Sequence, residues 1–470
     1  MIAQLENMMR NVKSLQRFYY SLPVPVMRIL LNLRAYPLVR MRYAKETFLW
    51  LDKLVERDEF TSEQLDNFVE EQISKITEIA KSIPYYQNYL NNDQTLKTLP
   101  VLTRESVRKN YEHLLNRQRK SLVRVFTSGS SGSGVPVYYD REAYLLNWAY
   151  LMKQRIWAKV DPRELRITFY GARIITPARD KPPFWIKNHL ENQYLMSIFH
   201  FSEKYAPHYI RFLEKKQGLV LEGFASVLYL VAQYVKELKG RLQFKAIFST
   251  GEPMYPFMRK EVEEAFGAKV YDSYGMTEWA GLIMECEKGG YHVLTDYGRL
   301  EILDEENVSV SVNEEGYMTW TGFTNAAMPF IRYKIGDKGI WKREACSCGK
   351  PYPLVQPTIT RVSDFVITPS GKVLSPRAIN QVLKDKVTFK ACQFIQNSQS
   401  ELIVRVVPDK AADYRAELDE LKRSLAAIVG DDVIVEEEIA DQPIRRGTQG
   451  KIPFIISKVN YENLNRERVC

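Results

Sequence analysis

The alternation of short apolar runs with longer helical patterns between residues 122 and 341 constrains the fold more than any other feature. Runs of strand length lie at 165–170, 244–248 and 270–274, and helical spacing recurs at 228–238 and 258–266. Strands that alternate with helices form mainly parallel sheets. The sequence therefore predicts an α/β fold for this large central part.

Other patterns flank the central part. Residues 46–90 show helical spacing of apolar side chains. After residue 361 the pattern changes to strands with helices at about 376–383 and 414–428, which is typical of a small α+β unit. Because 470 residues are too many for one ordinary core, we predict a basic amphipathic helical segment at 1–60, a large domain at 61–361 and a small mobile domain at 362–470.

The formal net charge of +9 is concentrated near the N-terminus. Residues 7–45 carry eight basic side chains and no acidic one, which leaves about +1 for the rest of the chain and argues against a nucleic-acid partner. Apolar and aromatic residues interleave the basic ones, as in an amphipathic segment on an anionic bilayer. A helix packed on the main domain is the other interpretation, and the sequence leaves both open.

The sequence also bears on the compartment. No uncharged apolar run reaches the roughly 18 residues of a transmembrane helix, and no small-residue cleavage site follows an apolar core near the N-terminus. We therefore expect a cytoplasmic protein, peripheral to the inner face of the membrane if the basic segment binds lipid.

Five polar segments carry residue types suited to a nucleotide, and they lie at residues 127–136, 271–278, 332–337, 361–364 and 445–451. The first is rich in glycine and serine, so its backbone amides and hydroxyls can cradle a phosphate, although it lacks the lysine of a Walker loop. The others offer an aromatic ring for a base, carboxylates for magnesium and ribose hydroxyls, and a lysine in a flexible loop. Each segment alone is an ordinary turn or loop.

The order of these segments resembles the adenylate-forming superfamily of acyl-CoA synthetases and peptide-synthetase adenylation domains. Within it the chain is most similar to the phenylacetate-CoA ligase branch and to related proteins of capsular polysaccharide clusters. The resemblance runs from about Ile83 to the C-terminus. It implies an enzyme that uses ATP and Mg²⁺ to activate a carboxylic acid as its acyl-AMP. The acyl group would then pass to the thiol of coenzyme A (CoA) or of a phosphopantetheine carrier protein.

The resemblance also implies roles for single residues. The phosphate loop would comprise Thr127, Ser128, Gly129, Ser130, Ser131 and Gly132. Tyr274 and Gly275 would contact adenine, Thr277 the α-phosphate, Glu278 Mg²⁺, Asp337 the ribose hydroxyls, Arg361 ribose or phosphate at the hinge, and Lys451 would be the adenylation lysine. Three departures from the family pattern are two extra residues before Pro136, Thr360 in place of a glycine, and Ser363 in place of the hinge aspartate.

The resemblance places the acyl pocket between helix and sheet of the large domain. Its expected residues are Tyr170, Gly171, Gly223, Phe224 and Ala225. Glu252, expected to line the adenine and acyl pockets, and Glu222 could select a polar or amino-bearing acid.

A second group of residues suggests a metal. Cys286 and His292 are separated by five residues, and Cys346 and Cys348 by one. Three thiolates and one imidazole suit tetrahedral zinc, and a site with four protein ligands would be structural. Four unrelated residues are the alternative interpretation. Some relatives in the phenylacetate-CoA ligase branch carry a structural zinc at a similar pattern.

Two other functions stay open at this stage. The enzyme could pass the acyl group from the adenylate to an amine or hydroxyl of a surface-polymer precursor. A non-catalytic nucleotide-binding scaffold is the third hypothesis, and the joint presence of Lys451, Glu278 and Asp337 argues against it.

Overall fold

The computed structural model describes residues 18–90, 99–127, 135–169, 174–176, 179–201, 204–358, 365–374, 379, 389–408, 413–442, 444 and 454–459. Its helices are α3 (Val24–Arg42), α4 (Lys45–Glu56), α5 (Ser62–Lys81), α6 (Pro84–Leu90), α7 (Arg104–Asn110), α8 (Arg141–Trp157), α9 (Ala206–Glu214), α10 (Ala225–Glu237), α11 (Pro256–Phe266) and α13 (Arg415–Val429). Two short 3-10 turns lie at Arg57–Glu59 and Ile198–His200.

Helix α5 illustrates why residues 46–90 are helical. The Thr61 hydroxyl accepts a hydrogen bond from the Gln64 amide (3.2 Å), and the Gln64 side chain accepts one from the Thr61 amide (2.8 Å). This capping box satisfies backbone donors at the start of the helix. The inner face of α5 buries Leu65, Ile76 and Ala80. The helical prediction for this region is confirmed.

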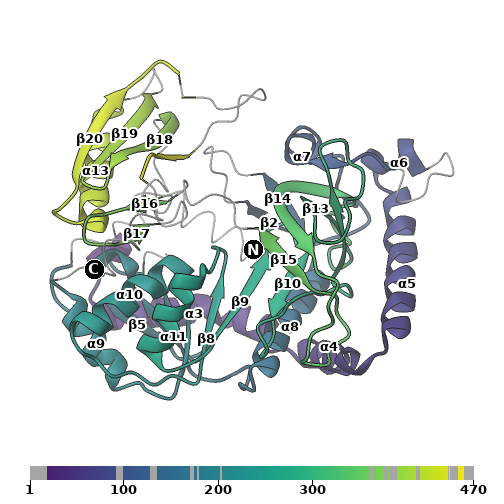
Figure 1. Cartoon of the computed structure of the whole chain (residues 1–470), viewed down its shortest axis with the longest axis horizontal. Helices are drawn as coiled ribbons and strands as arrows, with labels where there is room; N and C mark the ends of the chain where they lie inside the picture. Colours follow the sequence, from purple (N-terminus) through teal and green to yellow (C-terminus); the bar gives the residue numbers. More distant parts are fainter. Residues whose placement is uncertain are drawn as a thin grey trace.

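The central sheet has eight strands in the order β11-β10-β9-β8-β7-β4-β6-β5. Their bounds are β4 (Arg166–Phe169), β5 (Trp185–Asn188), β6 (Gln193–Met196), β7 (Val220–Gly223), β8 (Ala246–Thr250), β9 (Val270–Gly275), β10 (Leu282–Glu285) and β11 (Tyr291–Val293). The strands from β9 to β6 run parallel, and β5, β10 and β11 are antiparallel to their neighbours. Helices α9 to α11 cover one face of the sheet, and α3 and α8 lie behind it (Figure 1). The predicted α/β class is confirmed.

A second sheet lies on the far side of β9, to the right in Figure 1. It consists of β1 (Leu102–Thr103), β12 (Gly298–Leu303), β13 (Glu315–Gly322), β14 (Tyr333–Trp341) and β15 (Val355–Thr358). Only β1 pairs in parallel, with β14, and the other pairings are antiparallel. The segments that join β12 to β13 (304–314) and β13 to β14 (323–332) contain no helix and are shorter than the crossover of about a dozen residues or more that parallel strands need, which favours antiparallel pairing. The parallel pattern predicted up to residue 341 therefore ends before this sheet.

The C-terminal part has a sheet of its own, drawn in yellow in Figure 1, in the order β20-β19-β18-β21. Its strands are β18 (Phe389–Ser398), β19 (Glu401–Pro408), β20 (Ile434–Ile439) and β21 (Ile455–Ser457), preceded by the hairpin of β16 (Val366–Ile367) and β17 (Val373–Leu374). Helix α13 packs Leu418, Leu421 and Leu425 into a core with this sheet. The predicted helix at 376–383 and the predicted boundary at 361–364 lie outside the described residues, apart from Ile379.

The hairpin β16–β17 contacts both the large domain and the C-terminal sheet. Phe365 packs edge-on against Tyr255, with 5.4 Å between ring centroids, and Gln233 donates to the Gly371 carbonyl at 3.1 Å. On the other side, the Gln396 side chain accepts from the Ile367 amide (3.0 Å) and donates to its carbonyl (2.6 Å). These contacts hold the small sheet beside α10.

The N-terminal segment forms α3, whose Met27 packs with Ile174, Ile175 and Ile186 of the large domain. The interpretation of a helix packed on the main domain is confirmed for its inner face. In the part of the chain that the structure describes, no helix combines the length and apolarity needed to cross a membrane.

Candidate functional site

The hairpin of β2 (Val123–Phe126) and β3 (Pro136–Tyr139) holds the two ends of the glycine- and serine-rich loop. The Thr127 amide donates to the Val135 carbonyl (3.0 Å), and the Val135 amide donates to the Thr127 hydroxyl (2.9 Å). Thr127 is therefore fixed at the base of the loop. The other predicted loop residues, Ser128, Gly129, Ser130, Ser131 and Gly132, lie outside the described residues.

Arg104 is a candidate site residue that the sequence interpretation missed. It begins α7, which is capped by the Thr103 hydroxyl accepting from the Ser106 amide at 3.1 Å. Its Nη2 donates to the Thr127 hydroxyl at 3.4 Å, and its buried Nε has no hydrogen-bond partner among the described residues. A cation in this place suits a polyanion bound at the loop. Nothing in the local sequence separates Arg104 from an ordinary helix start.

Tyr274 and Asp337 face each other across the two large sheets. Tyr274 ends β9 of the eight-stranded sheet, and Asp337 lies in β14 of the five-stranded sheet. The Tyr274 hydroxyl donates to Asp337 Oδ2 at 2.8 Å. The structure thus brings together two residues that were predicted from segments 63 positions apart. Gly275, the next predicted residue, is exposed at the end of β9.

Glu278 follows β9 and is 2% exposed. Tyr333 donates to its Oε1 at 2.7 Å. Burial raises the pKa of Glu278 above its ordinary value, while the hydrogen bond from Tyr333 and the nearby Arg104 charge act in the opposite direction. The ionised form of this carboxyl group is the one that can accept a metal cation.

Thr277 is held by its backbone. The Tyr139 hydroxyl donates to the Thr277 carbonyl, and the Tyr139 ring stacks on Trp279 with 3.7 Å between centroids. Trp279 adopts a positive φ of 53°, so the chain turns sharply directly after Glu278. Thr127, Thr277, Glu278, Tyr274 and Asp337 therefore lie around the junction of the hairpin and the two sheets.

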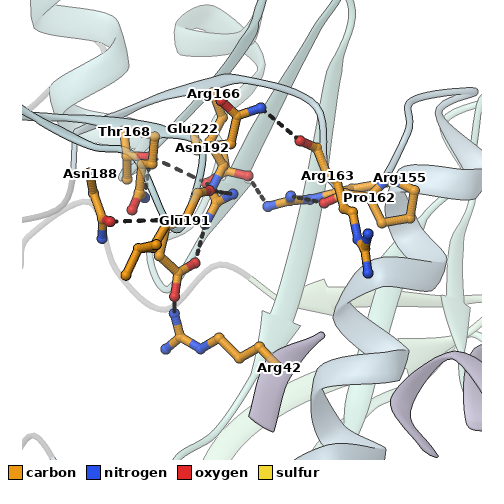
Figure 2. A network of polar contacts seen from close by, with 12 residues as sticks. Arg42, Arg155, Pro162, Arg163, Arg166, Thr168, Asn188, Glu191, Asn192 and Glu222 are labelled. Carbon is orange, nitrogen blue, oxygen red and sulfur yellow. Dashed lines mark hydrogen bonds and ion pairs between the residues drawn. The ribbon is translucent and has the colours of Figure 1, made fainter. Parts of the chain in front are cut away.

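The two glutamates that were expected to select a substrate are engaged by the protein itself. Figure 2 shows Glu222, in β7, within a network in which Arg155 and Arg166 form ion pairs with its carboxylate. Glu252 accepts a hydrogen bond from the Ser226 amide at 3.0 Å, at the start of α10. These ion pairs argue against selection of an amino group by Glu222, because two guanidinium groups already compensate its charge.

Three of the predicted acyl-pocket residues, Gly223, Phe224 and Ala225, lie at the junction of β7 and α10. A Cβ atom added to Gly223 would lie 3.1 Å from side-chain atoms of Leu228 and Phe169, so this position requires a small residue. Phe224 and Ala225 are buried at the start of α10. Tyr170, Gly171, Arg361 and Lys451 lie outside the described residues.

The predicted metal ligands converge. The ligand atoms of Cys286, His292, Cys346 and Cys348 all lie within 4.8 Å of one another. The Sγ atoms of Cys286 and Cys346 are 3.6 Å apart, and Cys348 Sγ lies 3.2 Å from His292 Nε2. Three sulfur donors and one imidazole in this arrangement fit zinc.

The surroundings of His292 also suit a metal. Its Nδ1 lies 2.9 Å from the Tyr352 carbonyl, and donation to that oxygen leaves Nε2 directed at the sulfur atoms. A Cβ atom on Gly290 would come within 2.9 Å of Cys346 Sγ, so the turn between Cys286 and His292 must pass close to the cluster. The four residues connect the β10–β11 hairpin with the loop between β14 and β15.

The chain is similar in sequence and in fold to several known proteins. A protein-family model described as the CapK C-terminal domain matches residues 366–458. The chain is 25% identical over 460 residues to Protein CapK of Staphylococcus aureus, covering 95% of this chain and 100% of that protein. It is 31% identical over 137 residues to the phenylacetate-coenzyme A ligase of Thermus thermophilus, covering 28% of this chain and 31% of that protein.

The fold matches solved structures of 2-hydroxyisobutyryl-CoA ligase. One, in complex with 2-HIB-AMP and CoA in the thioesterification state, has a TM-score of 0.57 at 18% identity and covers 88% of this chain and 94% of that one. Another, in the postadenylation state with R3-HIB-AMP, has a TM-score of 0.52 at 18% identity and covers 87% and 93%. The chain shares the fold of these ligases, and its sequence is similar to CapK over nearly its whole length and to a phenylacetate-CoA ligase over a shorter stretch. These similarities support the adenylate-forming superfamily and its phenylacetate-CoA ligase branch.

The groups around this junction have the chemistry that binding of a nucleotide requires. On one side of the junction, Tyr274 offers an aromatic ring and the hydrogen-bonded Asp337 offers a carboxylate that can accept hydrogen bonds. Thr127 and Arg104 offer a hydroxyl and a cation on the other side. Glu278 stands in the same junction, where a divalent cation could bridge its carboxylate to phosphate oxygens.

Proposed function

We propose that this chain is an ATP-dependent acid–thiol ligase, which converts a carboxylic acid to its acyl-AMP and then to a thioester. The observation that carries the proposal is the meeting of Thr127, Arg104, Glu278, Tyr274 and Asp337 at one junction of this fold. Together they supply contacts for phosphate, metal, base and ribose.

Each residue has a role in the proposal. Tyr274 stacks on adenine with Gly275 beside it, Asp337 accepts from ribose hydroxyls, and Thr277 contacts the α-phosphate. Glu278 would hold Mg²⁺, which would offset the phosphate charge, and the loop from Thr127 to Gly132 would bind phosphate. Arg361 and Lys451 complete the set by resemblance to the superfamily.

The proposed reaction has two balanced steps. A carboxylate oxygen of the acid attacks the α-phosphorus of ATP, the bond to the bridging oxygen breaks, and pyrophosphate leaves. Lys451 would offset the charge that accumulates as two anions meet. A thiol sulfur then attacks the acyl carbon, AMP leaves with the electron pair, and the thiol proton passes to solvent.

We further propose that the acid carries no free amino group. The chain compensates Glu222 with Arg155 and Arg166 and uses Glu252 at the start of α10. The predicted pocket positions at Gly223, Phe224 and Ala225 have no charged side chain to pair with an ammonium group. Aryl, fatty and hydroxy acids are therefore the classes to test first.

The resemblance of the sequence to proteins of capsular polysaccharide clusters leads to a second candidate. In it the acyl-AMP forms in the same way, but the acceptor is an amine or hydroxyl of a polysaccharide precursor. Release of AMP that depends on CoA or a carrier thiol would favour the ligase, whereas AMP release that depends only on a sugar acceptor would favour this alternative. A non-catalytic scaffold would release AMP with neither acceptor.

Zinc at the Cys286, His292, Cys346 and Cys348 cluster is proposed as a structural component. The donor set and the convergence of its atoms support this ion. All four ligands would come from the protein, so the ion would contribute to folding rather than to the reaction.

ATP–pyrophosphate exchange tests the proposal directly. Purified protein is assayed with a panel of aryl, fatty, hydroxy and amino acids, with Lys451→Ala as the matched control. Exchange with a member of the panel, lost in Lys451→Ala, is expected. ATP binding without exchange for any acid would contradict adenylation and favour the scaffold.

A further inference from the structure

Helix α3 has an apolar face that points away from the protein. Ile29 is 58% exposed, Leu33 65% and Tyr36 52%. These residues follow each other at intervals of four and three, so they lie on one side of the helix. Val26 and Leu30 belong to the same side and are also exposed. Six of the 16 exposed large hydrophobic residues in the described part of the chain lie between residues 18 and 36.

The opposite face of α3 holds the helix firmly in place. Met27 and Ala35 are buried. Asn32 donates to the Lys187 carbonyl (3.3 Å) and accepts from the His189 amide (2.8 Å). The outer apolar face is therefore presented by a packed helix and does not result from fraying.

Arg42 anchors the C-terminal end of the same helix. Its Nη1 binds Glu191 Oε1 at 2.7 Å, and its Nε donates to the Tyr144 hydroxyl at 2.8 Å. Glu191 in turn binds Arg166, which pairs with Glu222 in the central sheet (Figure 2). The helix is thus tied through a continuous polar network to strand β7.

The charged side chains of α3 are all basic. Arg28, Arg34 and Arg40 are exposed on α3, and residues 7–45 contain no acidic side chain. A basic, apolar helix face is complementary to a bilayer with anionic headgroups, because the apolar side chains enter the acyl boundary while the arginines contact phosphates. A protein partner would need a matching apolar groove lined with acidic side chains.

An open hollow at the start of α3 extends this apolar surface. Its volume is about 480 Å³, and it is lined by Pro23, Val24, Pro25, Arg28, Arg179 and Pro183. Almost all of its lining is apolar, so it can take an apolar group next to the helix.

We propose that the outer face of α3 docks on an anionic phospholipid bilayer, with the helix lying in the plane of the membrane surface. The protein would then carry out its reaction beside the membrane, since α3 packs against β5 of the catalytic domain. This proposal does not depend on the acid or acceptor that the enzyme uses.

Vesicle co-sedimentation of the full-length protein tests it. Phosphatidylcholine vesicles are compared with vesicles containing a quarter phosphatidylglycerol, at low and at high salt. We expect binding to the anionic vesicles, with at least a tenfold weaker partition for Leu33→Glu and a marked loss at high salt. Val308→Glu is the matched control, because Val308 is 60% exposed but lies far from α3 in the sequence.

The outcomes separate the possible occupants of this face. Equal binding of wild type and Leu33→Glu, or no binding of wild type to anionic vesicles, would overturn the proposal. A concentration-dependent dimer in sedimentation velocity that Leu33→Glu dissociates, without vesicle binding, would assign the face to a second copy of the chain. An unchanged thermal midpoint for Leu33→Glu would show that the helix still packs.

Discussion

At the scale of single residues, tyrosine hydroxyls position the carboxylates of the candidate site. Tyr333 donates to Glu278, and Tyr274 donates to Asp337. Burial alone would favour the protonated form of a carboxyl group, and a hydrogen bond to the carboxylate opposes that effect. The site can thus keep Glu278 available to a cation although it is almost fully buried.

Tyr333→Phe is expected to change the pH dependence of activity. The pKa of Glu278 is already raised by burial, and the Tyr333 hydrogen bond lowers it. Without that hydrogen bond the pKa rises, so protonation competes with Mg²⁺ at higher pH. The acidic limb of the exchange rate should move up by about one pH unit, while the rate at alkaline pH changes little. An unmoved limb would exclude Glu278 as the metal ligand.

Arg104→Ala is expected to weaken binding of the phosphates. The guanidinium lies at the base of the phosphate loop, so its loss should raise the KM for pyrophosphate in the exchange assay by roughly tenfold or more. Arg104→Lys should restore part of the effect, since it keeps the charge. Arg108→Ala, later on the same helix, is the control. Equal KM values for Arg104→Ala and wild type would limit Arg104 to a structural role.

At the scale of elements, α3 shows how one helix can have two uses. Its inner stripe and Arg42 attach it to the central domain, while Ile29, Leu33 and Tyr36 remain exposed. Arg42 also lies over the Trp148 ring, 4.3 Å from its centroid. The network in Figure 2 makes the position of this helix depend on residues of β7 and of the turn before β6.

Arg42→Ala should therefore destabilise the protein by about 2 kcal/mol, because Glu191 loses one of its two partners in a buried place. The measurement is urea unfolding followed by fluorescence. Arg40→Ala, on the exposed side of the same helix, should stay within about 0.5 kcal/mol of wild type. Similar losses of unfolding free energy for both variants would show that the contacts of Arg42 stabilise the protein no more than an exposed arginine does.

At the scale of the whole molecule, the cysteine–histidine cluster joins the two large sheets. Cys286 and His292 belong to the β10–β11 hairpin at the edge of the eight-stranded sheet, and Cys346 and Cys348 follow β14 of the five-stranded sheet. The candidate nucleotide site lies between the same two sheets, since Tyr274 and Asp337 come from one each. An ion in the cluster would help to fix their relative position.

Metal analysis of the purified protein should give about one zinc ion per chain. Chelation or Cys348→Ser should lower the thermal midpoint by roughly 10 °C, because the ion contributes folding energy. Cys392→Ser is the control, since Cys392 lies outside the cluster. Zinc-free protein with an unchanged midpoint would refute a structural metal.

The sequence by itself determined the type and order of the main features. The apolar periodicity predicted α5 and the parallel strands, and the order of weak motifs identified the superfamily. The spacing of Cys286, His292, Cys346 and Cys348 predicted a cluster that the structure brings together. These features are readable because periodicity, turn residues and ligand types act over short stretches of chain.

Only the tertiary structure decided which charges are compensated and which faces are covered. The sequence left Glu222 as a possible selector of the acid substrate, whereas the structure pairs its carboxylate with Arg155 and Arg166. Arg104 joined the site because α7 lies beside Thr127, and α3 proved to be both packed and exposed. Such outcomes depend on contacts between residues far apart in sequence, as for Arg42 and Glu191, which are 149 positions apart. No local pattern encodes the burial or the partner of such a charge.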